Sequence, residues 1–302
     1  MSKVMLENHP RKPLFAALMS ALLPGFGQLY NGEINKAIWV YVSFAILAIP
    51  MGIVIALYLP SSLMMFALVM ALVAVLGVWL FGIVDAWRGA AKQSEYHLKS
   101  WQSSGMYVLV LVLFGFLALP LLTNYVRFHQ VESFRIPSGS MSPTIVRGDF
   151  LFADKRYSCA GCKQAVQRGD IVVFANPNNR TLYYIKRVIA LPEDHVQIRG
   201  NEIFVNGQSL LTESDQSQLV ITESLGDKRW KVQWDASKAS QGLEMVVPAG
   251  EVFVLGDNRS ASNDSRTFGT VPLQDLVGKA RQVWLSLAED GVRWGRLGKV
   301  LN

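Results

Sequence analysis

The sequence Phe134-Arg-Ile-Pro-Ser-Gly-Ser-Met-Ser-Pro-Thr-Ile-Val-Arg-Gly-Asp149 directly follows the last long apolar run of a 302-residue chain. It divides the chain into an apolar half before it and a half of short β-type segments after it. Four hydroxyl side chains lie in it with two prolines and two glycines. Proline restricts φ and glycine permits strained backbone, so this composition predicts a turn that directs a side chain. An ordinary surface loop has the same composition, and a catalytic interpretation therefore requires a base elsewhere in the chain.

Three apolar runs before this stretch are long enough to cross a bilayer. They are Ala37–Leu57, about Leu63–Val84, and Met106–Val126, in which Pro120 predicts a kink. About 20 residues at roughly 1.5 Å per residue span a hydrocarbon core of about 30 Å. We therefore expect residues 1–126 to form a membrane module of transmembrane helices.

The loop between the last two runs predicts the orientation of these helices. Residues 85–101 contain the basic side chains Arg88, Lys92 and Lys99. Basic loops stay on the cytoplasmic side of a membrane. The run from Met106 would then lead outward, and everything after it would lie outside the cytoplasm.

The first apolar segment, residues 14–31, is interrupted by Pro24, Gly25 and Gln28. No small-residue cleavage site ends it, so it does not resemble a cleaved signal peptide. A fourth crossing would place the basic N-terminus outside, which the charge rule disfavours. We expect a re-entrant or interfacial segment, shielded by neighbouring helices, whose role the sequence leaves open.

Charge and composition exclude several classes of function. The first 126 residues contain seven of the 29 basic and four of the 23 acidic residues, so residues 127–302 carry 22 and 19, a net charge of +3. This excess is too small to indicate nucleic-acid binding and suits a domain near anionic lipid. The sequence contains no glycine-rich phosphate cradle and no His/Cys cluster with metal spacing, so we expect no cofactor and no metal.

Short β-type runs separated by turn signals follow residue 126. We expect residues 127–302 to form a mostly antiparallel β domain, with a secondary β insertion at about residues 200–250. The polar stretches 207–218 and 235–244 are expected to be exposed loops. The predicted strands are 150–154, 170–175, 182–191, 195–199, 202–205, 219–224, 230–234, 251–255 and 279–285.

Cys159 and Cys162 are the two cysteines of the chain, and the predicted topology places both outside the cytoplasm. A local disulfide, two free thiols and a redox pair all fit this spacing. The disulfide is the preferred interpretation, and the sequence leaves the alternatives open.

A serine nucleophile needs a base, and the histidines are poorly placed to supply one. Lys186 and Arg187 lie together in the apolar run 182–191. Alternation along a strand puts one of them on each face, so whichever face is buried carries a cation. Burial without a counter-charge lowers the pKa of a lysine, whereas arginine stays protonated. Lys186 is therefore the candidate base, although a lysine whose charged end reaches solvent is the commoner case.

A third polar stretch follows the predicted strand 251–255. It reads Gly256-Asp-Asn-Arg-Ser-Ala-Ser-Asn-Asp-Ser-Arg266 and mixes acids, bases and serines. A salt-bridged corner explains most of this pattern, and one of its serines could orient the amine of Lys186, which is the role of the third member of a triad.

Together these stretches resemble bacterial type I signal peptidases, or leader peptidases, which are membrane-anchored serine proteases with a Ser/Lys dyad. The similarity covers about residues 130–290, including Arg168-Gly-Asp-Ile-Val-Val-Phe174, and it implies a signal-peptidase-like β fold. By this resemblance Ser140 is the nucleophile, Lys186 the general base and Ser138 the hydroxyl of the oxyanion hole. Ser262 takes the place of the serine that hydrogen-bonds the lysine. The structural ion pair corresponds to Asp264 and Arg266.

The resemblance also implies the partners and the location of the protein. Its substrates would be exported pre-proteins with small residues before the cleavage site, and its other contact would be membrane lipid. It would lie in the bacterial inner membrane as a multi-pass protein, with its catalytic domain on the periplasmic side. The positions that match the family's shallow apolar pockets are Phe134, Ile136, Met141, Ile145, Tyr184 and Ile185.

Two departures from the family's pattern are visible. Ala190-Leu-Pro-Glu-Asp194 replaces the usual Gly-Leu-Pro-Gly-Asp, and three expected crossings exceed the usual one or two. Two alternative functions stay open. One is a Ser/Lys peptidase for a single pilin-like or transfer-system substrate, and the other is a non-catalytic membrane receptor for signal sequences. The oligomeric state also stays open.

Overall fold

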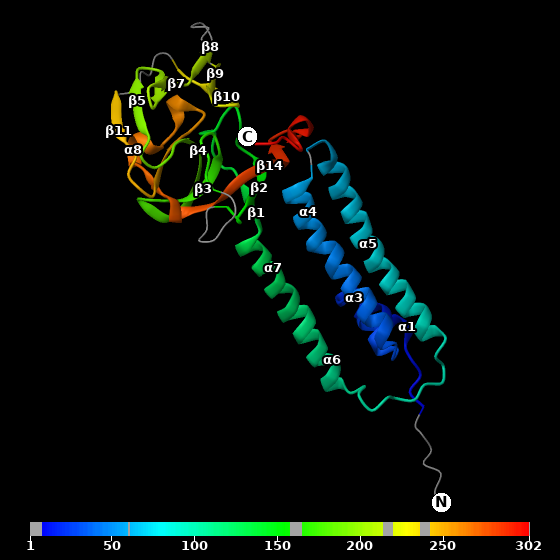
Figure 1. Ribbon diagram of the computed structural model, residues 1–302. Helices are drawn as coiled ribbons and strands as arrows, with labels where there is room; N and C mark the ends of the chain where they lie inside the picture. Colours follow the sequence, from blue (N-terminus) through cyan, green and yellow to red (C-terminus); the bar gives the residue numbers. More distant parts are fainter. Residues whose placement is uncertain (1–7, 60, 158–164, 214–219, 236–241, 302) are drawn as a thin grey trace, which may run out of the picture. The chain divides into compact units, whose positions relative to one another are not determined.

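A computed structural model describes residues 8–59, 61–157, 165–213, 220–235 and 242–301. The chain forms two compact units, which we describe separately. The helical unit consists of residues 1–59 and 63–127, and the β unit consists mainly of residues 128–302. Figure 1 shows long helices in the first unit and sheets in the second. Cys159 and Cys162 lie outside the described residues, so their bonding stays a prediction.

The helical unit contains the three predicted apolar runs within long helices. In the part of the chain that the structure describes, three helices are long and apolar enough to cross a membrane: Ile34–Tyr58, Leu63–Ala91 and Ser104–His129. At roughly 1.5 Å per residue each is longer than a hydrocarbon core of about 30 Å. The individual elements are α3 (Ile34–Ala48), α4 (Pro50–Tyr58), α5 (Ser61–Ala91), α6 (Ser104–Val110), a π-helix (Leu111–Ala118) and α7 (Leu119–His129).

The helix type changes just before Pro120, and the expected kink itself stays a prediction. The eight residues Leu111–Ala118 form π-helical turns, and α7 begins directly after them. Proline lacks an amide hydrogen and clashes with the preceding turn, so a local adjustment of the helix is expected there.

Residues 14–31 form a pair of short helices, α1 (Pro13–Leu22) and α2 (Phe26–Tyr30). Gly25 joins them with a φ of 87°, and a Cβ there would lie 2.3 Å from the carbonyl oxygen of Ala37. The buried amide side chains of α2 and the following turn bind the backbone of α5: Gln28 Nε2 donates to Gly82 O at 2.7 Å and Asn31 Nδ2 to Ala86 O at 2.8 Å. Both helices are too short to cross a bilayer.

The β unit is built on an eight-stranded sheet with the order β1-β2-β14-β3-β4-β12-β13, in which β15 pairs with β14. All its strand pairs are antiparallel, which confirms the predicted class of this part of the chain. The strands are β1 (Val131–Arg135), β2 (Asp149–Asp154), β3 (Ile171–Asn176), β4 (Asn179–Ala190), β12 (Glu251–Leu255), β13 (Val271–Pro272), β14 (Leu276–Ala288) and β15 (Gly291–Val292).

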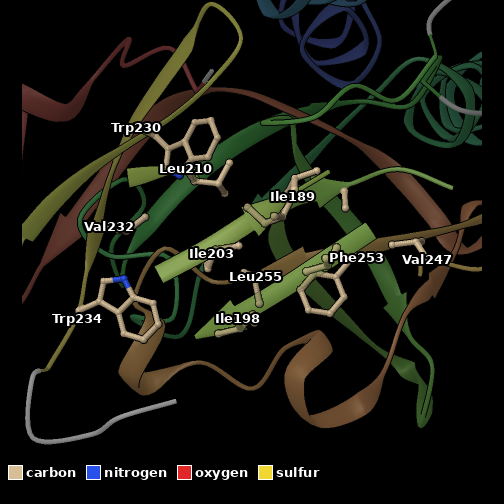
Figure 2. Packing of buried hydrophobic residues seen from close by; sticks show 13 residues of the cluster. Ile189, Ile198, Ile203, Leu210, Trp230, Val232, Trp234, Val247, Phe253 and Leu255 are labelled. Carbon is tan, nitrogen blue, oxygen red and sulfur yellow. The ribbon is translucent and has the colours of Figure 1, made fainter. Parts of the chain in front are cut away.

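Two smaller sheets lie between β4 and β12 in sequence. One has the order β10-β9-β8 and the other β11-β5-β6-β7. They share a core with the end of the large sheet, and Figure 2 shows members of this core, among them Trp230, Trp234, Ile203, Phe253 and Leu255. The strands are β5 (His195–Arg199), β6 (Glu202–Val205), β7 (Gln208–Ser209), β8 (Leu211–Glu213), β9 (Val220–Leu225), β10 (Lys228–Gln233) and β11 (Leu243–Val246).

The prediction of exposed loops at 207–218 and 235–244 was wrong in part. β7 and β8 occupy much of the first stretch, and Leu210 between them is fully buried. β11 begins at Leu243, inside the second stretch. Segments of two to four residues are too short to show a period of two, so the pattern does not reveal them. The remainder of both stretches lies largely outside the described residues.

Candidate active site

Ser140 lies in a turn that is fastened at both ends. Directly after β1, the backbone of Ile136 donates to Asp149 O at 2.8 Å, and the backbone of Gly148 donates back to Ile136 O at 2.9 Å. Inside this loop Met141 and Ile145 are almost completely buried in a core cluster. The apolar residues thus hold the turn against the sheet while Ser140 itself stays half-buried.

The strand β4 carries Lys186 into the same region. Residues 185–190 are buried on both faces of the strand. Lys186 and Arg187, which the predicted alternation puts on opposite faces, are therefore both inside the protein. Lys186 is 3% exposed and lies opposite Val172 of β3. Its Nζ lies 2.8 Å from Ser140 Oγ and 3.0 Å from the carbonyl oxygen of Ile185.

Burial lowers the pKa of Lys186 from 10.5 to about 8. Desolvation is the largest cause, and the positive charge of Arg266 acts in the same direction. The negative charges of Asp264 and Asp257 oppose the shift but do not cancel it. Among the described residues, no carboxylate forms an ion pair with this amine. A neutral amine next to a serine hydroxyl can accept its proton, which a normal surface lysine cannot do at neutral pH.

This pKa predicts the pH dependence of any reaction that uses Lys186 as a base. The neutral amine is the active form, so kcat/KM should rise about tenfold per pH unit below pH 8 and level off above it. Roughly a tenth of the amines would be neutral at pH 7. A pH–rate profile of the purified protein in detergent checks this. A profile that is flat between pH 6 and 9, or that falls through pH 8, would contradict it.

The lowered pKa of Lys186 also affects how the stability of the fold depends on pH. Because the folded value lies below the unfolded one, the unfolded chain binds more protons between pH 8 and 10.5, and this group alone makes the fold more stable as pH rises through that window. The difference corresponds to about 3 kcal/mol by linkage, present as a destabilisation below pH 8. Keeping this amine buried therefore lowers stability at neutral pH.

Ser138 lies two residues before Ser140 on the exposed side of the turn. The two hydroxyl oxygens are 3.4 Å apart. A hydroxyl at this position can donate to an oxygen that develops negative charge beside Ser140, which is the role of an oxyanion-hole donor.

The loop after β12 holds the backbone of the turn that carries Ser140. The backbone amide of Asn258 donates to Ser140 O at 3.0 Å, and its side-chain Nδ2 donates to Gly139 O at 3.2 Å. Gly256 permits this approach, since a Cβ there would lie 2.5 Å from Ser140 O. A side chain at position 256 would therefore push the loop away from Ser140.

Asp264 and Arg266 stabilise the same loop. Arg266 Nε donates to Asp264 Oδ1 at 2.8 Å, and Asp264 Oδ2 accepts the backbone amide of Gly256 at 3.0 Å. Asp264 also caps the short helix α8 (Ser265–Phe268) by accepting the backbone amide of Arg266. The ion pair therefore shapes the loop and does not contact Ser140.

Ser262 does not make the contact that the resemblance implied. Its Oγ is buried and has no hydrogen-bond partner within the described part of the chain, and the amine of Lys186 binds Ser140 and Ile185 instead. A Cβ on Gly256 would lie 2.1 Å from this Oγ, so the hydroxyl faces the backbone of Gly256. The role of Ser262 stays a prediction.

A cavity of about 570 Å³ opens beside Ser140 and Lys186. Of the six predicted pocket residues, Phe134, Ile136, Tyr184 and Ile185 line it. Met141 and Ile145 do not line this cavity. Both side chains are buried in the core cluster that also contains Ile136 and Ile185, and their part in the substrate pockets stays a prediction. Six residues on its wall were not predicted as site residues from the sequence: Arg135, Pro137, Val173, Tyr183, Ala261 and Asn263.

For two of these residues, the pairing of β3 with β4 indicates their place on the cavity wall. Val173 of β3 pairs with Ile185 of β4, and Tyr183 precedes Tyr184 on β4 and packs edge-on against Phe134. Once the pairing of β3 with β4 is known, a pocket residue on one strand identifies the residue opposite it on the other strand as a further candidate. Ala261 and Asn263 come from the loop after β12, whose path the sequence alone does not predict.

Comparison with known families gives two matches along the chain. Residues 106–285 match the family described as signal peptidase, peptidase S26. Residues 8–58 match a family of unknown function, DUF5683, which covers α1 to α4. The two matches do not overlap, so residues 8–58 and residues 106–285 resemble different families.

Several curated proteins are similar to the chain. A signal peptidase I of Pseudomonas fluorescens is 36% identical over 54% of this chain and 68% of that protein. A signal peptidase I of Rickettsia typhi is 32% identical over 53% of this chain and 74% of that protein. A signal peptidase I of Buchnera aphidicola is 28% identical over 70% of this chain and 84% of that protein.

Proposed function

The chain belongs to the signal peptidase family, peptidase S26, and is a serine peptidase that cleaves signal peptides; on this premise, we propose that Ser140 is the nucleophile and Lys186 the general base. The observation that carries this proposal is the 2.8 Å distance between Ser140 Oγ and the Nζ of a lysine whose pKa is about 8. A non-catalytic receptor for signal sequences is not favoured, because burying an uncompensated amine lowers stability and binding alone does not need it.

In the first half of the reaction Ser140 Oγ attacks the carbonyl carbon of the scissile peptide bond while its proton passes to Lys186 Nζ. The carbonyl oxygen becomes an oxyanion, which the Ser138 hydroxyl and the backbone N–H of Ser140 would stabilise. The tetrahedral intermediate collapses, the C–N bond breaks, and the ammonium of Lys186 gives its proton to the departing amine. That amine is the new N-terminus of the mature protein.

In the second half a water molecule attacks the acyl-enzyme ester. Lys186, neutral again, accepts a proton from the water, and the same two donors hold the second oxyanion. The ester bond breaks, Ser140 Oγ regains the proton from Lys186, and the signal peptide leaves with a free carboxylate. One amine therefore acts as base and then as acid in both halves.

The cavity beside the dyad supports a preference for small residues at the first and third positions before the cut. Its wall is largely apolar and contains the large side chains Phe134, Tyr183 and Tyr184 together with Ile136. A shallow apolar wall selects mainly by exclusion, because a larger substrate side chain collides with it. We infer exported pre-proteins with small residues at these positions as substrates.

The long apolar helices support insertion into a membrane with three crossings. With the basic loop 85–101 in the cytoplasm, the β unit would lie on the outer side of a bacterial inner membrane. The boundary near residue 127 agrees with a membrane module and a catalytic β domain. Protease added to spheroplasts tests this arrangement, since a β unit that stays intact until the cells are lysed would exclude it.

Cleavage of a pre-protein by the full-length protein in detergent tests the proposed activity. We expect a pre-protein with alanine at the first and third positions to lose its N-terminal peptide, with a product mass that fits one cut. A substrate with tryptophan at the first position should stay uncut, because the apolar wall excludes it. The Ser140→Ala variant is the matched control. Cleavage by this variant, or equal cleavage of both substrates, would contradict the proposal.

A further inference from the structure

The hairpin of β9 and β10 contacts the loop that holds the nucleophile turn. Glu223 of β9 is 2% exposed, and both of its carboxylate oxygens bind the guanidinium of Arg259. The indole nitrogen of Trp230, on β10, donates to Glu223 Oε2 at 3.1 Å. An ionised carboxylate with three hydrogen bonds in a buried site has one defined orientation.

Arg259 transmits this contact to the loop after β12. It is 1% exposed and begins a short 3-10 turn, Arg259–Ala261. Its Nε donates to Gly256 O at 3.1 Å, and its own carbonyl accepts Arg266 Nη2 at 2.6 Å. The side chain therefore ties the start of the loop to Glu223, while the backbone carbonyl of Arg259 holds Arg266 at the other end. The indole of Trp234 lies 5.7 Å from the guanidinium carbon of Arg259. Figure 2 shows Trp230 and Trp234 within the core of the two smaller sheets.

The end of the β9–β10 hairpin also binds the loop after β12 through two backbone amides. The amide of Gln233 donates to Asp257 O at 2.7 Å, and the amide of Asp235 donates to Ser260 Oγ at 2.7 Å. Between these two contacts lies Asn258, whose amide donates to Ser140 O. A continuous set of contacts, which is buried at Glu223 and Arg259, thus runs from the hairpin to the backbone of Ser140.

We propose that Glu223 is a positioning residue, which holds the 256–266 loop against Ser140 through Arg259 and thereby sets the distance between the Ser140 hydroxyl and the Lys186 amine. This proposal rests on the proposed function of that dyad. It assigns the β9–β10 hairpin a part in catalysis although none of its side chains lines the cavity beside Ser140. Removing the carboxylate leaves the buried guanidinium of Arg259 without its partner, and the loop has to move to hydrate it.

Glu223→Gln tests the proposal with nearly the same side-chain shape. Misplacement of a reacting group by about 1 Å costs on the order of 10²-fold in rate, so we expect kcat to fall about 10-fold to 100-fold with little change in KM. Glu223→Asp, which keeps the charge, should recover much of this loss. The measurement is the cleavage rate of a pre-protein by the full-length protein in detergent, well below the Tm of every variant.

Ile203→Val and Ile203→Ala provide controls matched for stability. Ile203 of β6 is 1% exposed in the same core but lies on the other small sheet. These variants lower Tm by graded amounts and should keep kcat near the wild-type value. If Glu223→Gln loses no more activity than the Ile203 variant of equal Tm, or if Glu223→Asp recovers none, the proposal is overturned.

The pH dependence of cleavage distinguishes a positioning role of Glu223 from a merely structural one. The charged groups that act on Lys186 are Asp264, Asp257 and Arg266, all in or beside the loop, while desolvation is the largest cause of its low pKa. A displaced loop admits water, so the rising limb for Glu223→Gln should shift above pH 8, whereas the Ile203 variants keep the wild-type limb. An unshifted limb would count against the proposal. Inactive wild-type protein or an active Ser140→Ala variant would instead refute the proposed function.

Discussion

Lys186→Ala and Lys186→Arg are both expected to lose cleavage activity by a factor on the order of 10⁴ to 10⁶, which is the range for removing a base from a serine-protease dyad or triad. Alanine removes the amine that lies 2.8 Å from Ser140 Oγ. Arginine keeps a positive charge but stays protonated at every accessible pH, so it cannot accept the proton of Ser140. The measurement is the release of the N-terminal fragment from a pre-protein at about pH 9, where the wild-type amine is largely neutral.

The stability of these variants separates loss of catalysis from loss of the fold. Because the buried amine of Lys186 lowers stability at neutral pH, Lys186→Ala should have a Tm equal to or above that of the wild type. The Ser140→Ala variant gives the background rate of a protein without a nucleophile. Cleavage by Lys186→Arg clearly above that background would show that another group serves as the base.

Asp257→Asn is expected to cause the largest loss of stability of any single change discussed for this protein. Asp257 and Arg187 are both fully buried and form a two-pronged ion pair, with Nε–Oδ1 at 2.9 Å and Nη2–Oδ2 at 2.8 Å. Removing one charge leaves the other buried and unpaired, which typically costs about 3–5 kcal/mol. For a unit of this size the loss corresponds to a fall in Tm of about 6–20 °C.

Thermal unfolding of the full-length protein in detergent measures this loss. Glu244→Gln is the matched control, because Glu244 pairs with His195 at 3.1 Å on the surface and its side chain is 64% exposed. Solvent and salt screen such a pair, so its Tm should stay close to that of the wild type. Equal Tm values for the two variants would show that the Arg187–Asp257 pair contributes nothing measurable to the fold.

Several features could be predicted from the sequence because they depend on local pattern. The apolar runs near residues 37–57, 63–84 and 106–126 indicate long helices by length alone. Alternation and turn signals after residue 126 predict an antiparallel β unit, which the structure confirms. The short strands β7, β8 and β11 were missed, since two to four residues carry no measurable period.

Only part of the candidate site could be predicted from the sequence. The serine-rich turn and the apolar run around Lys186 identify two chemical groups 46 residues apart, and the resemblance to a family links them. It also implies Met141 and Ile145 as pocket residues; both are buried beneath the turn, and their part in the pockets stays a prediction. The link from Glu223 through Arg259 to the backbone of Ser140 joins residues of three separate segments, and no local pattern contains it.

By itself, the sequence determined the order of the parts and the kinds of side chain available: apolar helices, a β-rich remainder, one serine-bearing turn and one lysine in an apolar strand. Only the tertiary structure decided the protonation of that lysine and the neighbours of that serine. The physical reason is that burial and charge act through space. The pKa of Lys186 depends on water excluded by β3, the nucleophile turn and the 256–266 loop together, and none of these lies next to it in the chain.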